Sequence, residues 1–139
     1  MAEVCVDASL VLKLVLPETK SDVVREHWKA WQAEGTEPIA PWLWLFEAHA
    51  VLRRKVARGE LLDMEAQDAW RTLRRQGIRT AHPRGLFDRA WAIAAVLGRP
   101  TTYDTVYLAV AELRGCELWT VDEQLARVAA GRFPQLRVV

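Results

Sequence analysis

The chain lacks several features that would each assign it to a particular class of protein. No apolar run reaches the roughly 18 residues that a membrane-spanning helix needs, which argues against a membrane protein. The start contains Glu3 and Asp7 and no basic stretch ahead of an apolar one, so we expect no signal peptide and a cytoplasmic protein. Only two cysteines occur, both in or beside apolar runs, which favours buried thiols over a disulfide framework.

Charge excess, glycine-rich loops and repeats are absent as well. The formal net charge is +1 at pH 7, so the overall charge predicts no nucleic-acid or membrane partner. No Gly-rich loop follows the first apolar run, which argues against a P-loop or dinucleotide-binding fold. We find no repeat, no low-complexity tract and no linker in the 139 residues. This length suits one domain, so we expect a single domain over residues 1–139.

The sequence instead alternates short apolar runs with longer amphipathic segments. Residues 4–7 are an apolar run that ends in Asp7, as expected for a strand buried on both faces of a parallel sheet. Further strands are predicted at residues 37–40, 78–81, 116–120 and 136–139. Helices are predicted at residues 9–16, 22–33, 41–58, 63–75, 85–97, 101–113 and 122–130. This alternation predicts an α/β fold with a parallel sheet covered on both faces.

Four acidic residues differ from the other acids in their sequence surroundings. Most acids have a basic residue three or four positions away, as Asp22 has Arg25, which is typical of a solvated helix face. The exceptions, with apolar neighbours and no Lys or Arg within one helical turn, are Asp7, Glu47, Asp104 and Asp122. A carboxylate in apolar surroundings is costly unless it is paired or binds a metal. Asp7 and Asp122 follow predicted strands, and Asp104 lies in the first turn of a predicted helix. Such positions face the carboxyl edge of the sheet.

These acids have two interpretations. Grouped carboxylates repel one another, and a divalent cation such as Mg²⁺ or Mn²⁺ would relieve that repulsion. Alternatively, Asp7 could cap the following helix, and either Asp122 or Thr120 could cap another. Asp104 lies in a first helical turn, where the helix dipole favours a negative charge. Glu47 has no capping role, because it lies in the middle of its predicted helix.

Four segments carry a resemblance to a known family. They are VCVDAS at residues 4–9, FEAHAVL at 46–52, YDTVYLA at 103–109 and LWTVDEQL at 118–125. Together they resemble the PIN domain, and more narrowly the VapC-type toxins of toxin–antitoxin pairs. One departure is Ala50, because family members often have Asn three residues after the Glu. This change removes a candidate hydrogen bond near Glu47 but removes no acid.

The resemblance implies a three-layer α/β/α domain with a mostly parallel sheet of four to five strands. It also implies a metal-dependent endoribonuclease, a homodimer, and an antitoxin that binds across the acidic site. The residues expected to hold Mg²⁺ or Mn²⁺ and to carry the reaction are Asp7, Glu47, Asp104 and Asp122. We expect Asp7 and Asp104 to be direct ligands, and the hydroxyls of Ser9 and Thr120 to orient carboxylates. The metal would activate a water for attack on an RNA phosphodiester.

Basic residues near this site are expected to hold RNA or an antitoxin. The candidates lie at the end of the predicted helix that carries Glu47: Arg53, Arg54, Lys55 and Arg58. The alternative for each is a solvated helix face. The three histidines show no metal-ligand spacing and are interpreted as surface or helix-packing residues. Trp28 and Trp44 are expected in the core, with an apolar groove for a partner helix as the alternative.

Two other functions are compatible with the same residues. The chain could be a catalytically silent PIN-like module that binds RNA or a protein partner. It could also transfer phosphate through Asp7 as a nucleophile, although such phosphatases usually carry a second Asp where this chain has Ser9. Metal-dependent RNA cleavage that Asp7→Asn abolishes would separate the nuclease from the silent module.

Overall fold

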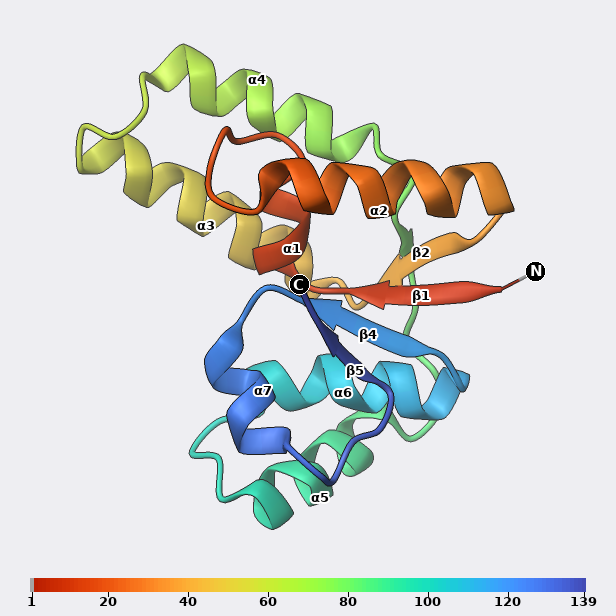
Figure 1. Cartoon of the computed structure of the whole chain (residues 1–139). Coiled ribbons are helices and arrows are strands. Elements are labelled where there is room, and N and C mark those ends of the chain that lie inside the picture. The colour runs from red at the N-terminus through yellow and green to blue at the C-terminus, as the bar shows by residue number, and fades with distance from the viewer. Residues whose placement is uncertain (1) are drawn as a thin grey trace.

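Five strands form one sheet in the computed structural model, which describes residues 2–139 (Figure 1). Their bounds are β1 (Glu3–Val6), β2 (Glu37–Ala40), β3 (Arg79–Thr80), β4 (Glu117–Thr120) and β5 (Leu136–Val138). The strand order is β3-β2-β1-β4-β5, and every neighbouring pair is parallel. The predicted parallel sheet of four to five strands is therefore confirmed.

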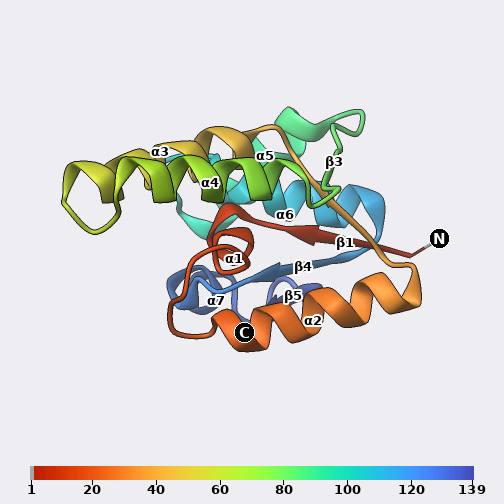
Figure 2. The ribbon, with the colours of Figure 1, turned by 90° about the horizontal axis from the view of Figure 1, so that it is seen from above.

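Seven helices in the described residues surround this sheet. They are α1 (Ala8–Leu12), α2 (Ser21–Glu34), α3 (Leu43–Ala57), α4 (Asp63–Arg74), α5 (Leu86–Leu97), α6 (Tyr103–Arg114) and α7 (Glu123–Ala129). Figure 2 shows α2 and α7 on one side of the sheet and α3 to α6 on the other, with α1 at the end of β1. This arrangement is the three-layer α/β/α fold that the sequence resemblance implied.

The central strand β1 explains why the first apolar run has no polar face. It pairs with β2 on one edge and β4 on the other, and helices cover both of its faces. Val4, Cys5 and Val6 are all buried, as expected for a strand covered on both sides. The chain builds β2 and β3 to one side of β1 before it crosses to β4 and β5 on the other. Such a reversal places a crevice at the carboxyl ends of β1 and β4.

The tryptophans divide between the core and the surface. Trp28 on α2 and Trp44 on α3 are 5% and 3% exposed, so their assignment to the core is confirmed. The alternative groove around these two residues is wrong, because neither side chain is open to a partner. Trp42, in contrast, is 57% exposed at the start of α3.

The cysteines and histidines have structural surroundings that match their predicted roles. Both cysteines are free thiols, Cys5 buried and Cys116 half-buried. The histidines pack against aromatic rings: His27 on Trp119, for example, with ring centroids 4.6 Å apart. Over residues 2–139, no helix has the length and apolar character needed to cross a membrane.

Candidate active site

One cavity at the carboxyl edge of the sheet brings together acids from four segments of the chain. It has a volume of about 380 Å³ and is lined by all four predicted acids: Asp7 after β1, Glu47 on α3, Asp104 on α6 and Asp122 before α7. Ser9 and Tyr107 line it too. Asp7 and Asp122 reach it because both follow neighbouring parallel strands, whose carboxyl ends lie at the same edge.

Asp7 is the most deeply placed of these acids. Its side chain is buried and accepts hydrogen bonds from the Ser9 hydroxyl (2.7 Å), the Leu10 N–H (3.0 Å) and the Thr120 hydroxyl. Burial raises the pKa of Asp7 to about 6, although the hydrogen bonds from Thr120, Ser9 and Leu10 oppose this rise and the charge of Asp122 adds to it. The contacts of Ser9 and Thr120 are those expected of groups that orient this carboxylate.

Asp122 is the N-cap residue of α7. Its Oδ1 accepts from the N–H groups of Gln124 (2.9 Å) and Leu125 (3.1 Å), so the capping interpretation of Asp122 is correct. Thr120 does not cap α7, because its hydroxyl donates to Asp7 while it accepts from the Asp122 N–H at 3.0 Å. Within residues 2–139, the Oδ2 atom of Asp122 has no hydrogen-bond donor, which leaves it available to a ligand in the cavity.

Asp7 has a capping role as well, because its carboxylate accepts from the Leu10 N–H at the start of α1. The capping and metal-binding interpretations therefore do not exclude each other. A helix N-terminus fixes the carboxylate in one orientation, and the same carboxylate faces the cavity.

Glu47 is held by a tyrosine that the sequence reasoning missed. The Tyr107 hydroxyl donates to Glu47 Oε1 at 2.6 Å. Burial raises the pKa of Glu47, the hydrogen bond from Tyr107 opposes that rise, and the charges of Asp7 and Asp104 add to it. Burial and the neighbouring Glu47 charge raise the pKa of Tyr107, which keeps its hydroxyl protonated as a donor. Tyr107 lies three residues after Asp104 on α6, and this spacing was a signal in the sequence.

Asp104 has an ionic partner, contrary to the expectation that it is unpaired. Arg99 Nη2 lies 2.9 Å from Asp104 Oδ2. Arg99 precedes Asp104 by five residues, in the connection between α5 and α6, and so lies beyond one helical turn from it in sequence. The turn between the two helices brings the guanidinium back to the carboxylate.

The donor chemistry of this cavity fits a hard divalent cation, because its carboxylates and hydroxyls are all oxygen ligands. The mutual charge effects on Asp7 and Glu47 are also those that a cation would relieve. Over the described part of the chain, however, no three His, Cys, Asp or Glu side chains lie close enough together to hold one metal ion. Each carboxylate instead has a hydrogen-bond partner in the protein.

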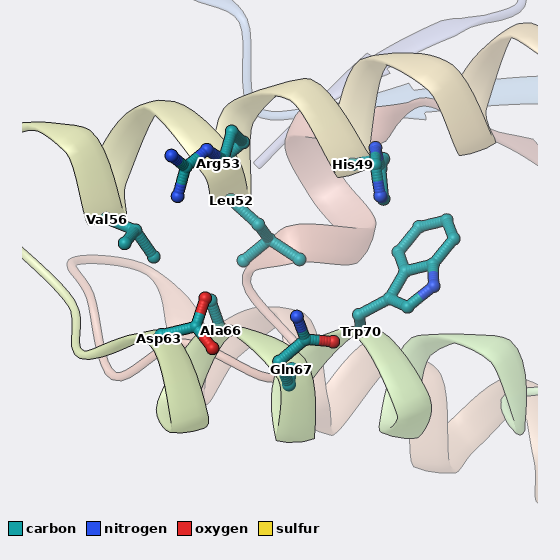
Figure 3. A pocket seen from close by; sticks show the side chains of 8 residues that line it. All are labelled: His49, Leu52, Arg53, Val56, Asp63, Ala66, Gln67 and Trp70. Atoms are coloured by element: carbon teal, nitrogen blue, oxygen red, sulfur yellow. The ribbon is translucent and has the colours of Figure 1, made fainter.

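The four basic candidates on α3 have different surroundings. Arg54 and Lys55 line the acidic cavity, whereas Arg53 lines a separate pocket between α3 and α4, which His49 and Trp70 also line (Figure 3). Lys55 is engaged with Glu18 at 3.0 Å and Glu60 at 3.4 Å.

Arg54 is exposed and has no ion-pair partner among residues 2–139. Of the four candidates, it is the one that both lines the acidic cavity and lacks such a partner. Arg58 is exposed at the C-terminal end of α3 and does not line this cavity. The structure thus separates residues that the sequence presents as one run.

Replacing Tyr107 by Phe should lower the free energy of unfolding by about 1–2 kcal/mol at neutral pH, because Glu47 loses a partly buried, charge-assisted hydrogen bond. Urea unfolding of the metal-free protein measures this change. Tyr103→Phe is the matched control, since Tyr103 is 59% exposed one residue before Asp104. Equal stabilities of the two variants would show that the Tyr107 hydroxyl does not stabilise the site.

The fold and the acidic cavity together define a class of protein. The sequence model of the PIN domain matches residues 4–131. The chain therefore belongs to the PIN domain family, as its motifs predicted.

The chain is also similar to individual proteins that are named as VapC ribonucleases. The chain is 35% identical over 83 residues to Ribonuclease VapC9 of Mycobacterium tuberculosis and to VapC ribonuclease Mb0985 of Mycobacterium bovis. The match covers 60% of this chain and 63% of each relative, slightly less than two thirds of their length. The crystal structure of PAE2754 from Pyrobaculum aerophilum has the same fold, with a TM-score of 0.66, 24% identity, and coverage of 94% of this chain and 87% of that one.

Proposed function

We propose that residues 1–139 form a single PIN-like domain that cleaves RNA internally with a divalent metal, as the toxin of a toxin–antitoxin pair acting in the cytoplasm. One observation carries the proposal: in a member of the PIN family, carboxylates from four distant segments line one cavity at the carboxyl edge of the sheet. The similarity to proteins named VapC ribonucleases supports the activity.

The proposed metal is Mg²⁺ or Mn²⁺, since the cavity offers only oxygen ligands. The residues that would hold it are Asp7, Glu47, Asp104 and Asp122. When bound, the metal supplies the Lewis acid that activates a water and neutralises charge on the phosphate. The protein supplies the orientation: Ser9 and Thr120 hold the Asp7 carboxylate, and Tyr107 holds Glu47.

Arg54 is the proposed contact for an RNA phosphate. Arg54 is an exposed residue on the wall of the acidic cavity, whereas Lys55 is engaged with two carboxylates. A planar guanidinium matches two phosphate oxygens, and its positive charge offsets the repulsion between the RNA backbone and the acids.

Arg54→Gln should weaken RNA binding about threefold to tenfold and reduce the salt dependence of binding by about one ion, because one phosphate contact is lost. Fluorescence anisotropy at several salt concentrations measures both quantities, in an Asp7→Asn background so that the RNA stays intact. Arg53→Gln is the matched control, since it removes the same charge from the neighbouring pocket. An equal effect of both substitutions would argue against a specific role for Arg54.

A second copy of the chain and an antitoxin protein are the proposed partners, as the resemblance to VapC-type toxins implies. Exposed apolar side chains support a protein-binding surface on α5: Phe87 and Trp91 are 76% and 74% exposed and lie four residues apart on the same face of the helix.

A catalytically silent PIN-like module that binds RNA or protein is the second candidate. The observation in its favour is that each acid already has a protein partner, and that no three acids within residues 2–139 converge on one point.

Calorimetry with Mn²⁺ and an RNA-cleavage assay with and without EDTA distinguish the two candidates. The nuclease requires that the wild-type protein binds Mn²⁺ and cleaves RNA, that EDTA stops cleavage, and that an Asp7→Asn, Asp104→Asn variant remains folded but binds no metal. RNA binding without metal binding or cleavage would favour the silent module.

A further inference from the structure

We propose that Arg99 is an internal counter-ion that holds Asp104 in the metal-free protein and is displaced from it when the metal binds. Arg99 is thus a positioning residue, and it sets the affinity of the site for its metal. This inference rests on the proposed metal-dependent function.

The ion pair is well defined by its surroundings. Arg99 Nη2 and Asp104 Oδ2 are 2.9 Å apart, and the two side chains are 24% and 32% exposed, so water screens the pair only in part. This is the one ion pair, within residues 2–139, that involves any of the four site acids. Asp7, Glu47 and Asp122 are held by neutral hydroxyl or backbone donors.

The turn that follows α5 sets the backbone position of Arg99. The N–H of Arg99 donates to the Ala94 carbonyl at 2.9 Å, directly after Gly98, which ends α5 with a φ of 65°. A left-handed backbone conformation at this position favours glycine and reverses the direction of the chain. Pro100 follows and restricts the backbone of Arg99 to an extended conformation. The guanidinium is therefore directed to the start of α6 by a turn of defined geometry.

The position of Asp104 explains why this pair matters for a metal. Asp104 lines the cavity with Asp7, Glu47 and Asp122, and its charge acts on Glu47. Without a metal, the Arg99 guanidinium provides the positive charge that offsets one of these acids. A divalent cation that takes Asp104 as a ligand competes with Arg99 for the same carboxylate. Metal binding therefore replaces the Arg99 guanidinium with the divalent cation at the Asp104 carboxylate.

Arg99→Gln tests this competition, because it removes the charge and keeps most of the side-chain length. We expect Mn²⁺ to bind about threefold to tenfold more tightly to Arg99→Gln than to the wild-type protein, as judged by calorimetry. We also expect a lower melting temperature of the metal-free variant and a larger rise on adding Mn²⁺. Arg99→Lys keeps the charge and should remain near the wild-type affinity.

Two controls separate the ion pair from other effects. Arg54→Gln removes the same charge from the wall of the same cavity without breaking a carboxylate pair, so it should change Mn²⁺ affinity less than Arg99→Gln does. In an Asp104→Asn background, Arg99→Gln should no longer lower the melting temperature of the metal-free protein.

The outcomes are distinct. Unchanged or weaker Mn²⁺ binding by Arg99→Gln, with normal binding by the wild-type protein, would overturn the role of Arg99 and leave the proposed function standing. Equal effects of Arg99→Gln and Arg54→Gln would also overturn it, since Mn²⁺ affinity would then depend on the total charge near the cavity and not on the Arg99–Asp104 ion pair. A wild-type protein that binds no Mn²⁺ would overturn both proposals.

Discussion

Asp7→Asn is expected to abolish metal-dependent RNA cleavage, with a loss of about 10³-fold or more. Asp7 lies at the end of the central strand, and it is the most buried acid in the cavity. Asn has nearly the same shape but carries no charge, so the variant loses an anionic ligand for the proposed metal. Cleavage of a labelled RNA under single-turnover conditions measures the loss.

The substitution should leave the fold intact, which makes the activity loss interpretable. The carbonyl oxygen of the introduced side chain can accept from the Ser9 hydroxyl and the Leu10 N–H, and its amide group can donate to the Thr120 oxygen. Asp88→Asn is the matched control, because Asp88 is exposed on α5 and does not line the acidic cavity. Cleavage by Asp7→Asn at the wild-type rate would refute the proposed site.

The metal-free protein should become less stable by about 3 kcal/mol as the pH rises from about 4 to about 7, through Asp7 alone. Burial raises the pKa of Asp7 from 3.8 to about 6 in the folded state. Between these two values the folded protein binds more protons than the unfolded chain, so stability falls as the pH rises. The contribution is complete below about pH 4 and is lost as the pH rises through about 6.

Other carboxylates act in the opposite direction, so the effect of Asp7 must be isolated by difference. A hydrogen bond from Arg114 lowers the pKa of Glu3. For Glu18, burial raises the pKa, but hydrogen bonds from Lys55 and Lys13 outweigh burial and lower it overall. Both residues lose stabilising interactions as the pH falls through their folded-state pKa values.

Urea unfolding in EDTA, for the wild-type protein and Asp7→Asn across this pH range, measures the difference. The variant should be the more stable protein at pH 7, and the two should converge towards pH 4. Parallel stability curves would show that Asp7 does not titrate in this window. A more stable, inactive variant would mean that the site is maintained at a cost in stability.

Much of the fold could be predicted from local patterns. The apolar run before Asp7 predicted a strand covered on both faces, and β1 is such a strand. Proline and glycine marked helix ends, as at Gly98 after α5 and Gly115 after α6. These features depend on apolar periodicity and on backbone preferences within a few residues. Both of these properties can be recognised directly in the sequence.

The candidate site could be predicted in part for the same reason. Each of Asp7, Asp104 and Asp122 follows a strand or begins a helix, and parallel strands place such ends at one edge. Predicting that these acids share one edge requires only that the strands are parallel. It does not require knowledge of any side-chain contact. All four acids accordingly line one cavity.

The parallel α/β architecture and the acids that gather at the edge of the sheet follow from sequence patterns alone. What each acid contacts depends on the packing of distant segments: Tyr107 lies 60 residues from the Glu47 that it holds, and Thr120 lies 113 residues from Asp7. The tertiary structure also pairs Asp104 with Arg99. Local sequence encodes burial and backbone shape, whereas a hydrogen bond requires two groups within about 3 Å, and the packing of distant segments sets that distance.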